Sequence, residues 1–118
     1  LVCYDLRFPV WSRNVNNEYD LLIYVANWPI PRRLVWDTLL RGACFGKSML
    51  CMWCQQVGID GYQLTYNGGS RVYSAFGEEI GPIPDGKEGI TTVSVNLTAL
   101  DQFREKFPVW KDADEFHL

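Results

Sequence analysis

The sequence of 118 residues lacks the features that direct proteins to nucleic acid or to membranes. It has no basic excess, because 11 Lys and Arg residues stand against 14 Asp and Glu residues. Its longest apolar runs, such as Leu21 to Ala26, are far shorter than the roughly 20 residues that span a bilayer, and no charged-then-apolar leader opens the chain. We therefore expect a soluble, cytoplasmic protein that binds neither partner.

Residues that bind metals or form disulfide bonds are also few. The chain has one histidine, His117, and four cysteines: Cys3, Cys44, Cys51 and Cys54. A zinc site built on the C-x-x-C sequence of residues 51–54 would need Cys44 and His117 as further ligands, at unsuitable spacing. Because 47% of the residues are hydrophobic, the chain can fill a core without disulfides. We expect reduced thiols and no metal.

The order of apolar segments predicts one mixed α/β domain, with a sheet covered by helices. Residues 19–26 form an apolar run without a period of two, which is typical of a strand buried on both faces. Other strands are predicted at residues 49–57, 62–66, 70–75 and 89–97, and helices from about Arg33 and over Thr98 to Lys106. The adjacent acids Glu78 and Glu79 are predicted to form a solvated turn.

Cys3 lies at the end of a short apolar strand and before a tight polar loop. In a nucleophile elbow the side chain projects from the sheet edge in this way, and the following N–H groups can hold an oxyanion. A buried structural cysteine is the alternative. Because Leu1-Val2-Cys3 resembles the end of a strand whose beginning is missing, we expect the chain to be a fragment.

The neighbourhood of Cys3 favours the nucleophile. The segment Cys3-Tyr4-Asp5-Leu6-Arg7-Phe8-Pro9 resembles the nucleophile motif of the nitrilase superfamily of carbon-nitrogen hydrolases. The resemblance is closest to the omega-amidase branch and continues through residues 19–29, Arg33, Trp36, residues 39–40, 57–61, 66–70 and 107–116. It implies an α/β fold, namely the C-terminal half of a nitrilase-type αββα sandwich. Residues 1–118 would then be the C-terminal part of a single domain whose N-terminal half is absent.

The resemblance also implies roles for particular residues. Cys3 would attack an amide carbonyl, the N–H of Tyr4 would stabilise the oxyanion, and Asn27 and Trp28 would border the substrate pocket. Asp5 and Arg7 are expected to brace the elbow, by pairing with each other or with neighbours. No metal or organic cofactor is implied.

The family also requires a glutamate base and a lysine, both carried on its N-terminal half. His117 in the charged tail is a poor substitute, so the fragment alone should have little activity. The complete protein would hydrolyse the omega-amide of a small 2-oxo dicarboxylic acid monoamide such as 2-oxoglutaramate. A homodimer is implied, with the tail from Lys111 to Leu118 at its interface. Another carbon-nitrogen hydrolase, such as a carbamoyl amidase, and a non-catalytic degenerate fragment are the alternatives.

Residues Arg41 to Gln56 depart from the family pattern without any residue gained or lost. One nucleotide sequence that encodes Gly42 to Gln56, when translated one base later, encodes Ala-Arg-Ala-Leu-Glu-Asn-Gln-Cys-Phe-Val-Cys-Gly-Val-Asn, which resembles the family motif. We therefore hypothesise a pair of compensating frameshifts, which the codons of the gene would test. On this hypothesis the C-x-x-C sequence is accidental. Otherwise Gly46 costs the helix about 1 kcal/mol relative to Ala.

Overall fold

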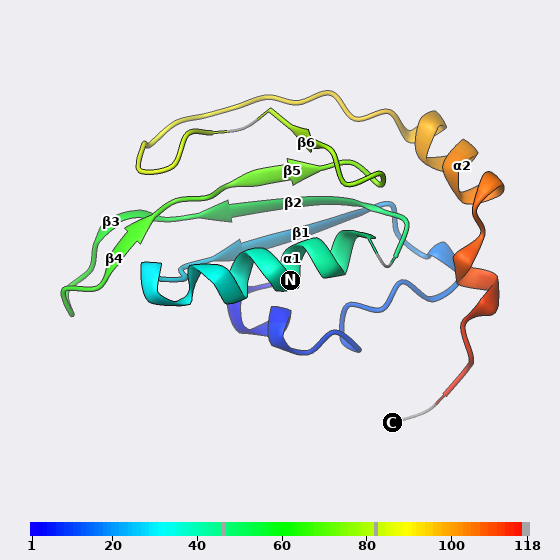
Figure 1. The fold of residues 1–118 in the computed structure, drawn as a ribbon, viewed down its shortest axis with the longest axis horizontal. Helices are drawn as coiled ribbons and strands as arrows, with labels where there is room; N and C mark the ends of the chain where they lie inside the picture. The colour runs from blue at the N-terminus through cyan, green and yellow to red at the C-terminus, as the bar shows by residue number, and fades with distance from the viewer. Residues whose placement is uncertain (46, 82, 117–118) are drawn as a thin grey trace.

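The computed structural model describes residues 1–45, 47–81 and 83–116, and its centre is a strand-helix-strand unit. Strand β1 (Leu21–Ala26) pairs in parallel with β2 (Leu50–Gln55), and helix α1 (Arg33–Phe45) connects them (Figure 1). Parallel neighbours require such a crossover. The predicted helix from Arg33 is confirmed, as is a strand within each of residues 19–26 and 49–57.

The sheet continues on the far side of β2 with short antiparallel strands. Its order is β1-β2-β5-β6, where β5 is Arg71–Tyr73 and β6 is Glu79–Ile80. A separate hairpin of β3 (Val57–Ile59) and β4 (Thr65–Asn67) extends beyond the carboxyl end of β1 (Figure 1). Glu78 and Glu79 are exposed as predicted, but Glu79 also belongs to β6 and pairs with Arg71 at 2.8 Å.

Short helices frame this sheet at its ends. The 3-10 helix η1 (Cys3–Arg7) follows the first two residues, η3 (Ile30–Arg32) leads into α1, and η2 (Val15–Asn17) and η4 (Val109–Asp112) lie in loops. Helix α2 (Leu97–Lys106) matches the prediction of a helix over Thr98 to Lys106. It begins at Asn96, whose side chain accepts a hydrogen bond from the N–H of Ala99 at 3.0 Å.

A buried arginine attaches α2 to the sheet. The side chain of Arg104 is only 8% exposed, and its Nη1 meets Asp20 Oδ1 at 2.5 Å. Its Nε donates to the carbonyl of Ser48 at 3.0 Å and its Nη2 to the carbonyl of Tyr19 at 2.9 Å. Because each group has a partner, the buried charge is compensated.

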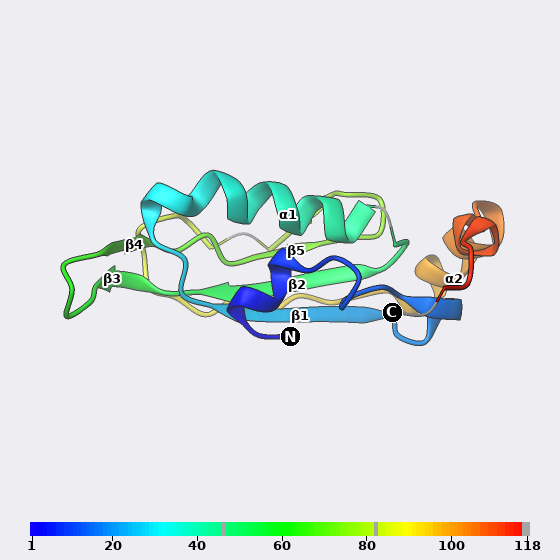
Figure 2. The same ribbon diagram turned by 90° about the horizontal axis from the view of Figure 1, so that it is seen from below.

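The main hydrophobic core lies between α1 and one face of the sheet (Figure 2). Tyr24 of β1, Trp53 of β2 and Tyr73 of β5 point to this side, and Trp53 stacks on Tyr73 with ring centroids 4.8 Å apart. From α1, Trp36 and Leu40 fill the space with no exposed surface. Aromatic side chains of this size each bury a large apolar area.

No helix of the described residues lies on the opposite face of the sheet (Figure 2), which corrects one prediction. Residues 19–26 were expected to be buried on both faces, but β1 alternates between buried and exposed positions. Ile23 is 43% exposed and Val25 is 55% exposed, while Leu22, Tyr24 and Ala26 are buried beneath α1. The side chains of β1 are apolar on both sides, and the described chain covers only one side.

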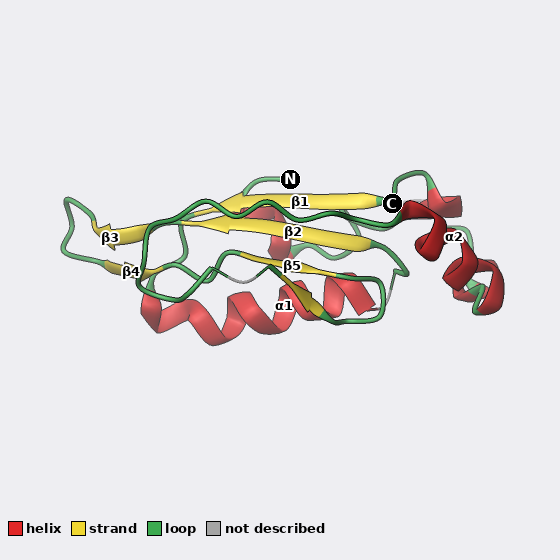
Figure 3. Cartoon of the chain, turned by 90° about the horizontal axis from the view of Figure 1, so that it is seen from above, coloured by secondary structure: helices red, strands yellow, loops and turns green. Residues whose placement is uncertain are grey.

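The strand predicted at residues 89–97 is also wrong for the described chain. Residues 89–96 are extended but pair with no described strand, and most of them are exposed. Figures 1 and 3 together show this segment running beside the β5–β6 edge of the sheet, at the opposite edge from β1. A cavity of about 530 Å³ lies between the segment and the sheet, lined by residues that include Met52, Cys54, Ile90 and Val93. The β-branched composition favours a strand, but a strand needs a partner.

None of the helices in the described ranges has the length and apolar character needed to cross a membrane.

Candidate active site

Cys3 occupies a strained turn between a strand-like segment and a helix. Val2 forms a parallel bridge with Val25 of β1, and η1 begins at Cys3. Cys3 has a φ of 44°, a left-handed conformation that is uncommon for a residue other than glycine and is often found at functional sites. Its thiol is free and partly buried. The geometry therefore agrees with the elbow inferred from the sequence.

Asp5 holds this turn in place. Its Oδ2 accepts a hydrogen bond from the N–H of Val2 at 2.9 Å, and its own N–H donates to the carbonyl of Val2 at 3.0 Å. The pair closes a loop around Cys3. The prediction that Asp5 braces the elbow is confirmed.

Arg7 braces the same turn through aromatic rings. Its guanidinium lies over the ring of Trp28, 4.7 Å from the centroid, and 5.8 Å from the centroid of Tyr4. Such stacking is favourable for arginine. The sequence left open whether Asp5 and Arg7 pair with each other or with neighbouring residues. In the described structure each contacts neighbours, and no ion pair joins the two.

Tyr4 presents its backbone and its ring in different directions. The first N–H groups of a helix have no partner within the helix, so the N–H of Tyr4 is available to bind an oxygen at the start of η1. Tyr4 is 65% exposed as a residue, and its ring meets that of Phe8 edge-on, with 5.5 Å between the centroids. Residues 7–11, with Asp5, line an open groove of about 540 Å³ beside this ring.

Asn27 and Trp28 follow β1 directly and have different environments. Asn27 is exposed, whereas Trp28 is 4% exposed and packs on Trp36 with ring centroids 5.4 Å apart. Since the guanidinium of Arg7 lies over the ring of Trp28, the loop and η1 are in direct contact. The structure thus places all the predicted site residues, Cys3, Tyr4, Asn27 and Trp28, at the carboxyl end of β1.

One contact of this loop was not predicted from the sequence. The N–H of Trp28 donates to Oε1 of Gln55 at 2.8 Å, and Nε2 of Gln55 donates to the carbonyl of Trp28 at 3.1 Å. Gln55 is the last residue of β2 and lies opposite Ala26. The only signal in the sequence was a carboxamide at the end of an apolar strand, which is too common to indicate a role.

The β3–β4 hairpin adds an acid and a phenol at the end of the sheet where Cys3 lies (Figure 1). Asp60 accepts hydrogen bonds from the N–H groups of Tyr62 and Leu64 and, at 2.8 Å, from the hydroxyl of Tyr66. The bond from Leu64 is the main reason that the pKa of Asp60 is lowered. The hydrogen bond to Asp60, and then burial, raise the pKa of Tyr66.

The Asn67-Gly68-Gly69-Ser70 segment packs against Arg33 at the start of α1. Gly69, with a φ of 100°, lies against the guanidinium of Arg33, where a Cβ would overlap it. Arg33 binds both carboxylate oxygens of Asp37 at 2.9 Å and also reaches Asp85. Burial opposes the charge of Asp85, but Arg71 and Arg33 outweigh it and lower its pKa. The network fixes the start of α1.

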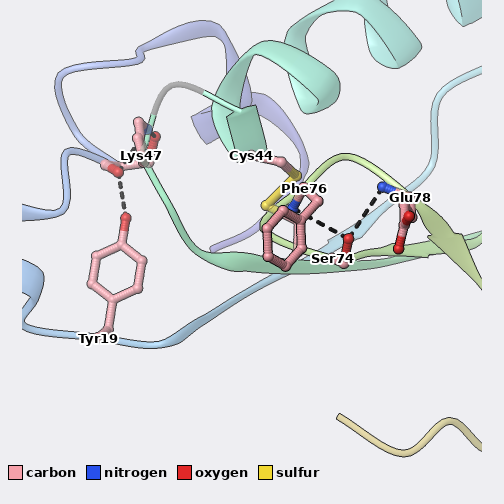
Figure 4. The surroundings of a disulfide bond; sticks show 8 residues. Tyr19, Cys44, Lys47, Ser74, Phe76 and Glu78 are labelled. Carbon is pink, nitrogen blue, oxygen red and sulfur yellow. Dashed lines mark hydrogen bonds between the residues drawn. A yellow bond between two sulfur atoms is a disulfide. The ribbon is translucent and has the colours of Figure 1, made fainter. Parts of the chain in front are cut away.

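The cysteines outside the elbow differ from the prediction. Cys44 at the end of α1 and Cys51 in β2 form a disulfide, with Cα atoms 5.8 Å apart, so the expectation of reduced thiols is wrong for this pair (Figure 4). The helix end and the strand bring two buried cysteines together that are only seven residues apart. Cys51 is therefore not free to act with Cys54, and no group of potential metal ligands occurs among the described residues.

Lys47 and Tyr19 meet at one loop near this disulfide. Both side chains donate to the carbonyl of Ser12, Lys47 at 2.7 Å and Tyr19 at 2.5 Å (Figure 4). Burial lowers the pKa of Lys47 to about 8. Burial, and then the charge of Tyr24, raises the pKa of Tyr19 to about 12. Gly46 and His117, which the sequence singled out, lie outside the described residues.

Comparison with known proteins gives consistent matches over nearly the whole chain. A family model described as carbon-nitrogen hydrolase matches residues 1–105. The chain is 48% identical to "Omega-amidase YafV" of Escherichia coli (strain K12) over 118 residues, which is 100% of this chain and 46% of that protein. It is 30% identical to "2-oxoglutaramate amidase" of Paenarthrobacter nicotinovorans over 93% of this chain and 37% of that protein.

A solved structure has the same fold. XC1258 from Xanthomonas campestris, described as a CN-hydrolase superfamily protein with an arsenic adduct in the active site, superposes with a TM-score of 0.92 at 38% identity. The match covers 99% of this chain and 46% of XC1258. The chain spans about half the length, or less, of the relatives it matches.

Proposed function

The chain belongs to the carbon-nitrogen hydrolase family, and from this premise we propose that it is the nucleophile-bearing half of a cysteine amidase. The observation that carries the proposal is the left-handed turn at Cys3, between a segment paired with β1 and the start of η1. A thiol held there projects from the end of the sheet, and the N–H of Tyr4 follows it.

The proposed reaction has two stages. The sulfur of Cys3 attacks the carbonyl carbon of an amide, and the thiol proton passes through a general base to the leaving ammonia. The N–H of Tyr4 holds the negative oxygen of the tetrahedral intermediate. Water then attacks the thioester, which releases the acid and restores the thiol. No metal or organic cofactor takes part in these steps.

We also propose that the remaining catalytic groups belong to the other half of a longer protein. The resemblance implies a glutamate base and a lysine there, and this chain spans only 46% of XC1258. Two features of the chain support this arrangement. The face of β1 that carries Ile23 and Val25 is apolar but exposed, and residues 89–96 are extended and pair with no described strand. A second sheet would cover this face of β1, and a further strand would pair with residues 89–96. Together they would complete an αββα sandwich.

The proposed substrate is the omega-amide of a 2-oxo dicarboxylic acid monoamide, such as 2-oxoglutaramate. Its support is that relatives at 48% and 30% identity are named omega-amidase and 2-oxoglutaramate amidase. The exposed Asn27 beside the buried Trp28 would contact this substrate. A cytoplasmic homodimer is the proposed state, which fractionation and light scattering of the full-length protein would test.

The decisive experiment is ammonia release from 2-oxoglutaramate by the full-length protein. We expect activity in the wild type and a loss of at least about 1000-fold in Cys3→Ala, because the nucleophile is gone. Cys54→Ala is the matched control, since Cys54 is also a free thiol but lies on β2 away from the elbow. Activity that survives in Cys3→Ala would exclude Cys3 as the nucleophile.

A second panel of substrates separates the alternatives. Activity on a carbamoyl amide but not on 2-oxoglutaramate would indicate a different carbon-nitrogen hydrolase. An inactive wild type, whose Cys3 reacts no faster than Cys54 with a thiol reagent, would indicate a degenerate protein in which residues 41–56 disable the site.

A further inference from the structure

Gln55 extends the pairing of β1 and β2 beyond the last backbone pair. Ala26 and Gln55 are the final partners of the parallel ladder, and the chain of β1 then turns away at Asn27. The carboxamide of Gln55 binds the next peptide instead, with one hydrogen bond from the Trp28 N–H at 2.8 Å and one to the Trp28 carbonyl at 3.1 Å. A primary amide can do this because it carries both a donor and an acceptor.

The backbone of Gln55 is itself fixed from the other side. Its N–H donates to Oγ of Ser70 at 2.9 Å, and the same hydroxyl lies 3.5 Å from the carbonyl of Gln55. Ser70 directly precedes β5, which pairs with β2. Gln55 therefore connects a rigid part of the sheet to the loop after β1.

Trp28 passes this constraint to the elbow. Its ring lies between Trp36 of α1, at 5.4 Å, and the guanidinium of Arg7, at 4.7 Å. Arg7 is the last residue of η1, and Cys3 is the first. The distance between the Asn27–Trp28 loop and Cys3 is thus set by contacts that begin at the carboxamide of Gln55.

We propose that Gln55 is a positioning residue of this site, and that its carboxamide holds the Asn27–Trp28 loop where a bound amide substrate meets it. The inference rests on the proposed function and adds to it a residue that determines substrate affinity. Leucine at this position would offer neither hydrogen bond, and an ionised glutamate would offer no donor. Asparagine keeps both groups on a side chain one methylene shorter. It is also the residue that the shifted reading frame places at this position.

The test is steady-state kinetics of the full-length protein on 2-oxoglutaramate. We expect Gln55→Leu to raise KM about tenfold, as the loss of about 1.4 kcal/mol of loop positioning would, while kcat stays within about threefold. Gln55→Asn should recover a large part of the affinity. Gln56→Leu is the matched control, since the side chain of Gln56 makes no hydrogen bond to a described residue, and its KM should not change.

A purely structural role would produce a different result. In that case Gln55→Leu would lower the melting temperature and the amount of active enzyme, and KM would equal that of the wild type. Such a result would overturn the proposal. If Gln55→Leu does not fold, Gln55→Glu decides, because it keeps the shape of the side chain and should still raise KM.

Alkylation of Cys3 separates this inference from the proposed function. Iodoacetamide is a small amide that reacts with thiols, and mass spectrometry can follow Cys3 and Cys54 in the same sample. If the wild type releases no ammonia, the proposed function fails. Slower alkylation of Cys3 in Gln55→Leu, with Cys54 unchanged, would still support the role of Gln55. Equal rates at Cys3 in both proteins would overturn it.

Discussion

The two faces of the sheet have similar sequences and different surroundings. On β1, Leu22 and Tyr24 are buried beneath α1, while Ile23 and Val25 between them point to the other face and are largely exposed. Leu22, Ile23 and Val25 are aliphatic and Tyr24 is aromatic, so composition does not distinguish the two faces. Exposed β-branched residues on one face of a strand are the pattern expected if the proposed second sheet covers that face.

The two cysteines of β2 also lie on different faces of the sheet. Cys51 points to the covered face, is fully buried and joins Cys44, whereas Cys54 is exposed on the bare face. Alternation along a strand is enough to give neighbouring cysteines different chemistry. The C-x-x-C pattern suggested a pair, but residues three apart on a strand point to opposite faces.

The largest expected effect comes from truncating the covered face. In the 118-residue chain, we expect Leu22→Ala to lower the free energy of unfolding by about 3 kcal/mol, because it leaves a cavity under α1. Ile23→Ala should cost less there, about 1 kcal/mol, since the residue is already 43% exposed. Urea unfolding measures both.

The same substitution in the full-length protein tests whether a second sheet covers this face. There we expect Ile23→Ala to cost about 2 kcal/mol, because the proposed second sheet would bury its side chain. An equal, small cost in both proteins would show that nothing covers the bare face.

A smaller effect is expected from the disulfide that joins α1 to β2. Reduction, or the Cys44→Ser variant, should lower the free energy of unfolding by about 2 kcal/mol, because the link closes only a short loop of the unfolded chain. Thermal unfolding with and without reductant measures the difference. Cys54→Ser on the bare face is the control and should leave the effect of reductant unchanged. A protein with four titratable thiols without reductant would contradict the pairing.

The smallest effect concerns Tyr19, which packs against the covered core. Its pKa is raised from 10.0 to about 12, so the folded protein keeps the proton longer than the unfolded chain. Its contribution is complete below about pH 10 and is lost as the pH rises from about 10 to about 12.

Tyr19→Phe should therefore lose about 1 kcal/mol at neutral pH and lack this alkaline loss. The pKa of Lys47, lowered from 10.5 to about 8, works in the opposite sense, since its neutral form is favoured by folding and stability rises from about pH 8 to 10.5. The difference between wild type and Tyr19→Phe cancels that contribution. Curves of unfolding free energy against pH that run parallel for the two proteins from about pH 10 to about 12 would contradict the prediction.

Much of the fold follows from local patterns in the sequence. Helical spacing from Arg33 and over Thr98 to Lys106 predicted α1 and α2, because amphipathic periodicity acts within a few residues. The strand at residues 89–97 failed for the opposite reason. A strand exists only with a partner, and no described strand pairs with this segment.

The candidate site was predicted in part for the same reason. Cys3, Tyr4, Asn27 and Trp28 were found through a resemblance that covers the chain, and the structure brings them to one end of β1. Gln55 and the Asp60–Tyr66 pair were not found, because their role depends on which peptide or hydroxyl lies opposite them. No local pattern encodes that distance.

The sequence by itself determined the family, the position of the elbow and the two long helices, since motifs and periodicity act over short stretches of chain. Only the tertiary structure decided which face of the sheet is covered, which cysteines pair and which side chain holds Trp28. The covered face and the contact between Gln55 and Trp28 depend on residues far apart in sequence that meet at distances of a few ångströms. The cysteine pair, only seven residues apart, depends on how the end of α1 is placed against β2. The geometry of the parallel β1–β2 pair, and not the composition of either strand, brings them together.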